Sequence, residues 1–385
     1  MASVLVWFVV FAMAAQLIGS VLALSTMTRR KSSAARTDCP AISVLRPVCG
    51  IENNLEETLT TTFQADYPEF EILFCVALPN DPAIPLVNRL MAAYPAVPAQ
   101  LLIGDDRISG NPKLNNLVKG WRAARHSMIL MADSNVLLPP DYLHRLMDQW
   151  EPGTGLVSSP PIGIRPDGFW ARLECAFLNT FQARWQLASV RMGNGFAQGK
   201  MLFWQRDLLE KAGGLAVLGT EMAEDVASTK VVRTAGLHVS LPNRFFAQPI
   251  GRRSFDAVWS RQLRWSRVRR LGFLMYFLPE LLAGAALPFV ALVILVASGV
   301  TLWAIPAFLV LWYGMEYVVA AKGDWPRAGA DVAAWGLRDL ILPVLWLASW
   351  AGSSFEWRGN VMSAGDVAEA PDAPPALNQT PNHGA

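Results

Sequence analysis

The chain has 385 residues, of which 52% are hydrophobic, and its formal net charge is +2 at pH 7. This length leaves room for one large or two modest folding units, and the mean hydropathy of +0.28 is high for a soluble protein. So small a net charge gives no reason to expect a nucleic-acid partner, and the polar part of the chain contains no basic block interleaved with aromatic residues.

The N-terminal residues 2–24 form an uncharged apolar run that is long enough to cross a bilayer. Basic residues 29–31 follow directly, and no basic segment precedes the run. Residues 1–25 are therefore predicted to be a transmembrane signal-anchor rather than a cleaved signal peptide, with residue 29 onward in the cytosol. Residues 26–40 are predicted to be a linker. The excess of Arg over Lys and the abundance of Ala fit a GC-rich bacterium, so the predicted location is the bacterial inner membrane.

Short apolar runs then alternate with helical patterns. The predicted strands are 41–45, 71–76, 99–103 and 128–132, and the predicted helices between them are 52–65, 83–94 and 114–125. This alternation predicts an α/β domain over residues 41–250, with a mostly parallel, Rossmann-like sheet covered by helices on both faces. Ligands of such sheets bind at the carboxyl ends of the strands. That rule selects Arg46, the turn at Asp81, the loop 104–113 and Asp133.

The C-terminal third is dominated by apolar segments. An aromatic-rich helix at 169–190 suits either the membrane surface or a protein core, and residues 251–280 are predicted to be interfacial amphipathic helices. Residues 281–360 form a predicted membrane region, with spans at 281–300 and 302–321 and a short third segment at 340–353 that is re-entrant, tilted or interfacial. Residues 361–385 are predicted to be a disordered tail.

Two aspartates follow predicted strands. Asp81 lies in Pro-Asn-Asp-Pro, where a turn or N-cap is the simplest role. Asp133 ends the strongest apolar strand and is followed by Ser134 and Asn135. A carboxylate with small oxygen-bearing neighbours suits a divalent cation held between protein and diphosphate, and an ordinary turn is an equally good reading of these residues.

Two further polar groups lie at helix starts. Glu224 and Asp225 are adjacent carboxylates, which either complement the helix dipole or, in a desolvated cleft, raise one pKa enough to make a general base. Asn111 and Lys113 precede another helix, where a cation and backbone N–H groups favour phosphate.

The segment Arg261-Gln262-Leu263-Arg264-Trp265 lies where the polar domain meets the apolar region. Arg261 and Arg264 fall on one side of a helix and can bind phosphate oxygens. The other interpretation is a basic interfacial helix anchored by Trp265. The two interpretations are compatible if the arginine pair binds a phosphate ligand while the neighbouring basic residues Arg267, Arg269 and Arg270 face lipid headgroups.

Taken in order, these motifs resemble the D, D, D, (Q/R)xxRW pattern of the ceramide glucosyltransferase family. The matching segments are Val44–Pro47, Asp81–Ile84, Asn111–Leu117, Ala132–Ser134, Ala223–Asp225 and Arg261–Trp265. The resemblance covers roughly residues 41–270 and implies an inverting glycosyltransferase of the GT-A fold. The implied reaction moves glucose from UDP-glucose to the primary hydroxyl of ceramide and forms β-glucosylceramide.

The resemblance also implies a role for each matching residue. Asp225 would be the general base and Glu224 its neighbour. Asp81 would hold the uridine, and Asp133 would bind Mg²⁺ or Mn²⁺ on the diphosphate. Arg46 would contribute to the donor site, and Lys113, Arg261 and Arg264 would help neutralise the leaving UDP. Trp265 would form a wall of the donor or the acceptor pocket.

Two departures from the family pattern leave other functions open. The metal motif has a single carboxylate, Asp133, which predicts a cation bound mainly through the diphosphate. Val226 stands where many ceramide enzymes have an aromatic residue, which leaves the acceptor open. The alternatives are transfer of an N-acetylhexosamine to a hopanoid or another membrane lipid and, from another class, a non-catalytic membrane scaffold or transport component.

Overall fold

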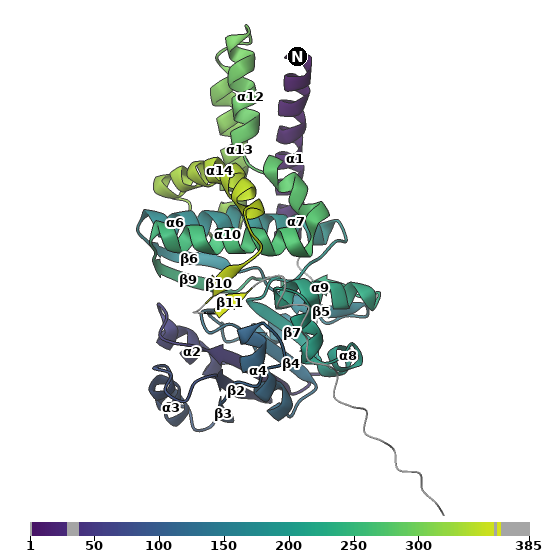
Figure 1. Ribbon diagram of the computed structural model, residues 1–385, viewed down its shortest axis with the longest axis vertical. Coiled ribbons are helices and arrows are strands. Elements are labelled where there is room, and N and C mark those ends of the chain that lie inside the picture. Colours follow the sequence, from purple (N-terminus) through teal and green to yellow (C-terminus); the bar gives the residue numbers. More distant parts are fainter. Residues whose placement is uncertain (1, 29–37, 358–359, 363–385) are drawn as a thin grey trace, which may run out of the picture.

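The computed structural model describes residues 2–28, 38–357 and 360–362, so most of the predicted linker and the predicted tail lie outside the described residues. A seven-stranded sheet has the order β3-β2-β1-β4-β7-β5-β8 (Figure 1). Every pairing in it is parallel except those of β7 with β4 and β5. The predicted, mostly parallel α/β sheet is confirmed. Its strands are β1 (Ile42–Val48), β2 (Phe70–Val76), β3 (Ala99–Ile103), β4 (Met128–Ala132), β5 (Thr154–Ser158), β7 (Met201–Gln205) and β8 (His238–Ser240).

Helices cover both faces of this sheet. One face packs against α2 (Leu55–Phe63), α3 (Ile84–Ala93) and α5 (Tyr142–Met147). The other packs against α4 (Pro112–Ala123), α8 (Arg206–Lys211), the 3₁₀ helix η2 (Leu215–Thr220) and α9 (Glu224–Thr234). Side chains of β1 alternate between these cores, Val44 on one and Leu45 on the other. The central strands are therefore buried on both faces, as near-continuous apolar sequences predict.

Strand β1 extends beyond its predicted end at residue 45. It pairs with β2 along its whole length, Ile42–Val48, but with β4 only through Leu45. Beyond Leu45 that side of β1 has no strand partner, so the missing N–H of Pro47 costs no ladder hydrogen bond. Arg46 consequently lies inside a strand rather than in a loop after it.

A layer of helices lies beyond the sheet. The predicted helix 169–190 is one helical run made of α6 (Phe169–Ala176), the π-helical segment η1 (Phe177–Ala183) and α7 (Arg184–Arg191). It packs against α10 (Phe255–Gly272) and α14 (Gly329–Trp350). A small parallel sheet of β6 (Ile162–Asp167) and β9 (Ala247–Arg252) lies beneath α6 and α10 (Figure 1).

Four stretches are long and apolar enough to cross a membrane: Ala2–Thr28, Leu274–Ala297, Ala304–Gly323 and Gly329–Trp350. The first is α1, and the others contain α11 (Leu274–Phe277), the 3₁₀ helix η3 (Leu278–Leu282), α12 (Ala286–Ala297), α13 (Ala304–Gly323) and α14; the hairpin β10 (Phe355–Trp357) and β11 (Asn360–Met362) follows. Figure 1 shows α1 and α12 extending away from the sheet, whereas α14 lies across their base. The predicted segment 340–353 overlaps the second half of the 22-residue helix α14, and its three alternatives stay predictions.

A buried ionic cluster joins these helices. Arg338 on α14 is 1% exposed, and its guanidinium contacts Glu316 of α13 at 2.8 Å and Asp339 at 2.8 Å. It also donates to Thr180 Oγ1 in η1 at 2.5 Å, and Gln16 of α1 donates to Glu316 at 3.3 Å. Arg338 thus neutralises Glu316 inside the apolar helix α13. One set of polar contacts connects α1, α13, α14 and η1.

We expect Arg338→Leu to lower the free energy of unfolding by about 3–5 kcal/mol, because it leaves Glu316 and Asp339 buried without their cation. Thermal unfolding of the full chain in detergent measures this. Arg89→Leu is the matched control, since the Arg89–Glu56 pair is exposed (61% and 62%) and its loss should change stability by about 0.5 kcal/mol or less. Equal stability of the two variants would contradict a structural role for the cluster.

Candidate active site

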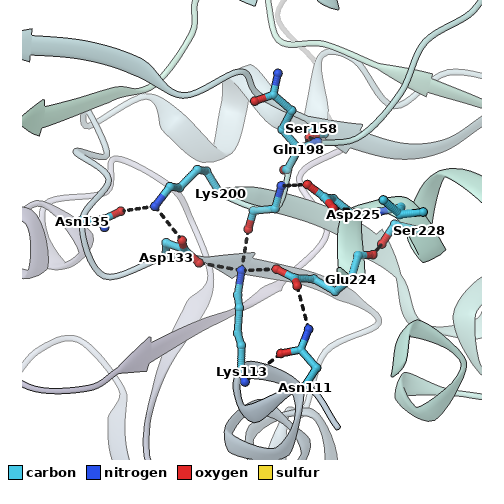
Figure 2. Close-up of polar contacts among 12 residues, drawn as sticks. Asn111, Lys113, Asp133, Asn135, Ser158, Gln198, Lys200, Glu224, Asp225 and Ser228 are labelled. Carbon is cyan, nitrogen blue, oxygen red and sulfur yellow. Dashed lines mark hydrogen bonds and ion pairs between the residues drawn. The ribbon is translucent and has the colours of Figure 1, made fainter. Parts of the chain in front are cut away.

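Asp133 stands at the carboxyl end of β4, opposite the start of β7. Its backbone N–H donates to Lys200 O at 3.0 Å, which extends the antiparallel β4–β7 ladder by one step. The side chains then meet as well, since Asp133 Oδ1 lies 2.6 Å from Lys113 Nζ and Oδ2 lies 3.0 Å from Lys200 Nζ (Figure 2). Both oxygens of the predicted metal ligand therefore face ammonium groups.

Lys113 connects Asp133 to the acid pair. It lies in the first turn of α4, where the N-cap residue Asn111 accepts a hydrogen bond from Lys113 N at 2.9 Å. Its buried Nζ contacts Asp133, Glu224 Oε1 at 2.7 Å and Gly199 O at 2.6 Å. The starts of α4, β7 and α9 and the end of β4 are held together at this one ammonium group.

The two adjacent acids have different partners. Glu224 binds Lys113, and its Oε2 also accepts from Asn111 Nδ2 at 3.0 Å. Among the described residues, Asp225 forms no ion pair; its oxygens accept from the backbone N–H of Gly199 at 2.9 Å and of Val226 at 2.8 Å. A Cβ at Gly199 would lie 2.7 Å from Glu224 Oε1, so a larger residue at this position would displace the Glu224 carboxylate.

The surroundings of Asp225 and Asp133 shift the pKa values of these two acids in opposite directions. Burial, followed by repulsion from Glu224, raises the pKa of Asp225 to about 6. Burial alone would also raise the pKa of Asp133, but attraction by Lys113 and Lys200 outweighs it and lowers that pKa well below its usual range. A carboxyl group whose pKa lies near neutral pH, beside a carboxylate that stays ionised, is the arrangement expected of a general base next to a group that stabilises charge.

Two predicted donor-site residues lie at the same edge of the sheet. Asp81, in the loop after β2, accepts from the N–H of Gly50 at 2.9 Å and of Ala83 at 2.8 Å. It joins the loops that follow β1 and β2, as a turn aspartate does, and a carboxylate can accept further bonds. Arg46 is fully buried, and its guanidinium donates to backbone carbonyls in α2 and in the loop after β4. It therefore links that loop to α2. Their contacts with a donor stay predictions.

The Arg261–Trp265 segment lies in α10. Arg261 pairs with Glu174 of α6 at 2.5 Å, and Trp265 packs on a cluster that includes Cys175 and Ile250. Arg264 lies on the same helix, partly buried. Of the arginines predicted to face headgroups, Arg267 and Arg270 donate to backbone carbonyls at residues 351–354, beyond the end of α14, and Arg269 pairs with Glu280, so their orientation toward a membrane stays a prediction. The predicted roles of Arg261, Arg264 and Trp265 toward the donor remain predictions.

Sequence reasoning missed Lys200, Gly199 and Glu174. Lys200 and Gly199 immediately precede the apolar run Met201–Gln205, but only the antiparallel placement of that run beside β4 brings them to Asp133. Glu174 looked like one of a few charges in an aromatic-rich helix, yet it is fully buried and is the partner of Arg261. None of these residues carries a local sequence signal.

The residues around Asp133 fit a divalent cation only if it arrives with a diphosphate. Among the described residues, no three His, Cys, Asp or Glu side chains gather closely enough to hold a metal ion. Hard cations need six or more oxygen ligands, whereas Asp133 offers one carboxylate that two ammonium groups already face. Phosphate oxygens would have to supply most of the ligands.

Comparison with known proteins identifies the family to which this chain belongs. The family model of glycosyl transferase family 21 matches residues 5–369. The chain belongs to this family. Ceramide glucosyltransferase 3 of Caenorhabditis elegans is 25% identical over 89% of this chain and 77% of its own length. The ceramide glucosyltransferase of Komagataella phaffii is 30% identical over 64% of this chain and 53% of its own length.

A solved structure shares the fold of this family 21 enzyme. The mannosyltransferase from Pyrobaculum calidifontis, solved with GDP-Man and Mn²⁺, aligns with a TM-score of 0.54 at 16% identity, over 88% of this chain and 98% of its own. The predicted GT-A fold, glycosyltransferase activity and resemblance to ceramide glucosyltransferases are thereby confirmed. The role of each site residue is a separate matter, which variants of the chain must test.

We expect the activity of the enzyme to fall as the pH drops through about 6, since Asp225 must be deprotonated to act as a base. Glu224→Gln should move this acid limb to lower pH, because removing the neighbouring negative charge lowers the pKa of Asp225. The dependence of kcat/KM on pH measures the shift. Asp207→Asn, an exposed acid on α8, should leave the limb in place. A limb that Glu224→Gln does not move would contradict the coupling of the two acids.

Proposed function

We propose that this family 21 enzyme transfers glucose from UDP-glucose to the primary hydroxyl of ceramide, with inversion, and releases β-glucosylceramide. The observation that carries the proposal is the buried network in which Asp225 lies beside Glu224, Lys113 and Asp133 at the carboxyl edge of a GT-A sheet (Figure 2). The ceramide glucosyltransferases among its relatives support the choice of donor and acceptor.

Asp225 is the general base of the proposed reaction. Its carboxylate accepts the proton of the acceptor hydroxyl while that oxygen attacks the anomeric carbon from the face opposite UDP. The bond from the anomeric carbon to the diphosphate breaks, and UDP leaves with the electron pair. A single displacement of this kind converts an α-linked donor into a β-glycoside. A pKa of about 6 for Asp225 leaves most molecules ready to accept a proton near neutral pH.

The donor lies along the sheet edge in this proposal. Asp81 accepts a hydrogen bond from the uracil, while Lys113, Arg261 and Arg264 supply positive charge that offsets the charge growing on UDP. Arg46 holds the loop that carries Asp133, and Trp265 forms one wall of the pocket. Asp133 would hold Mg²⁺ or Mn²⁺ together with the diphosphate, and the cation would neutralise the leaving group.

The helix layer gives the enzyme access to a lipid acceptor. Three neighbouring aromatic side chains at the starts of α6 and α10 are exposed by 37–40%: Phe169, Trp170 and Phe255. Aromatic residues of this kind prefer the membrane interface. We infer that they rest there and that the sheet faces the cytosol of a bacterial inner membrane, so a water-soluble donor and a membrane-dissolved acceptor meet at one site.

The residue after the proposed base, Val226, is the reason to consider a second class of donor and acceptor. This residue follows the proposed base and packs closely against Gly272, where a Cβ would lie 2.6 Å from Val226 Cγ1. The small side chain beside the base leaves N-acetylhexosaminyl transfer to a hopanoid or other membrane lipid as the second candidate. The intact acid–lysine network argues against a non-catalytic scaffold.

Mass spectrometry of lipids formed from a panel of UDP-sugars and acceptors tests the proposal. UDP-glucose with ceramide should give hexosylceramide, and Asp225→Asn should lower turnover by about 10²–10⁴-fold, the usual contribution of a general base, while UDP still binds. Asp207→Asn on the surface is the control for folding and should keep full activity. Products from a hopanoid but from no sphingolipid would favour the second candidate, and near-normal turnover by Asp225→Asn would remove that residue from the base role.

A further inference from the structure

We propose that Lys200, rather than Lys113, donates directly to the donor diphosphate, and that its ammonium group supplies charge that lets the enzyme bind its nucleotide without a divalent cation. This inference rests on the proposed function and deepens it. The enzyme would then tolerate removal of the metal to a degree set by Lys200.

The two lysines differ in how many of their donors are already used. An ammonium group has three N–H donors. Lys113 Nζ contacts Asp133, Glu224 and Gly199 O, so all three are engaged within the protein. Within the described chain, Lys200 Nζ contacts only Asp133 Oδ2 and Asn135 Oδ1, each at 3.0 Å. Lys200 can therefore bind a phosphate oxygen without giving up a partner, whereas Lys113 cannot.

The backbone fixes Lys200 at the correct place. Lys200 lies in the turn just before β7, and the hydrogen bond from Asp133 N–H to Lys200 O places the two residues opposite each other at the end of the β4–β7 pair. Its side chain is 14% exposed and Figure 2 shows its ammonium group between Asn135 and Asp133. The group is pre-organised, and a small opening to solvent remains for a ligand.

The charges around Lys200 also suit an anion. The basic side chains of Lys200, Arg253 and Arg261 lie near one another, since the charge of Arg261 acts on both of the others. Within the described chain, Arg253 Nε is buried without a hydrogen-bond partner. Cations that disfavour one another would be stabilised by a bound diphosphate.

A metal ion and Lys200 would serve the same purpose. A cation bound to Asp133 Oδ2 must displace the Lys200 ammonium or lie beside it at a distance where like charges repel. The fixed ammonium group of Lys200 thus compensates for the single carboxylate of the metal motif, because it supplies part of the positive charge that a divalent cation would provide. Lys113 then acts on UDP through its charge alone, without a direct hydrogen bond, and it also holds Glu224 and Asp133 in place.

The test is isothermal titration calorimetry of UDP against the full chain in detergent, with saturating Mn²⁺ and separately with EDTA. The wild type should bind UDP in both. Lys200→Met should weaken binding at least about tenfold in EDTA, the usual worth of a charged hydrogen bond, and by less in Mn²⁺. Lys200→Arg should restore most of the binding in EDTA. Lys211→Met, an exposed lysine on α8, is the matched control.

The outcomes separate this inference from the proposed function. UDP binding by the wild type that requires Mn²⁺, or an equal affinity of Lys200→Met in EDTA, would overturn the role of Lys200 and leave the donor intact. The absence of any UDP binding would overturn both. A second measurement needs no variant: the preference of the wild type for UDP over UMP should persist in EDTA, and its loss there would count against a protein cation at the second phosphate.

Discussion

The buried ammonium group of Lys113 is the interaction on which the site depends. An ammonium group leaves water only when anions and carbonyls replace its hydration, and Lys113 has Asp133, Glu224 and the Gly199 carbonyl at 2.6–2.7 Å. Each of these partners comes from a different element. The α4 helix start, the β4 end, the β7 start and the α9 start are thus brought together by one charge, and the sheet and its helices supply the frame that holds them there.

This shared lysine also explains why two adjacent acids behave differently. Glu224 takes the lysine and the Asn111 amide, so its charge is compensated. Asp225 is left with backbone N–H groups as its hydrogen-bond donors. Burial and then repulsion from Glu224 outweigh these bonds and raise the pKa of Asp225 to about 6. The difference arises from which side of the α9 start each side chain faces. A helix that begins with two acids would otherwise be an ordinary dipole arrangement.

Sequence patterns predicted most of the sheet but only part of the site. The strands β1 to β4 and the helices between them follow from apolar periodicity, and the aspartates at strand ends follow from the rule for parallel sheets. Lys200, Gly199 and Glu174 were not predictable, because each acts through a partner brought near by an antiparallel strand or a distant helix. The extension of β1 through Pro47 was missed because its free edge is a tertiary property.

The same physical device recurs where the catalytic sheet meets the membrane-facing helices. Arg261 of α10 neutralises Glu174 inside α6, and Arg338 of α14 neutralises Glu316 of α13. Since a buried charge without its partner costs several kcal/mol, each pair fixes which helix faces may pack together. The helix that carries Arg261 is also tied by Arg267 and Arg270 to the chain just beyond α14. These contacts fix the position of α10 relative to α6 and to the chain beyond α14, so a shift of α10 along α6 would separate Arg261 from the fully buried carboxylate of Glu174.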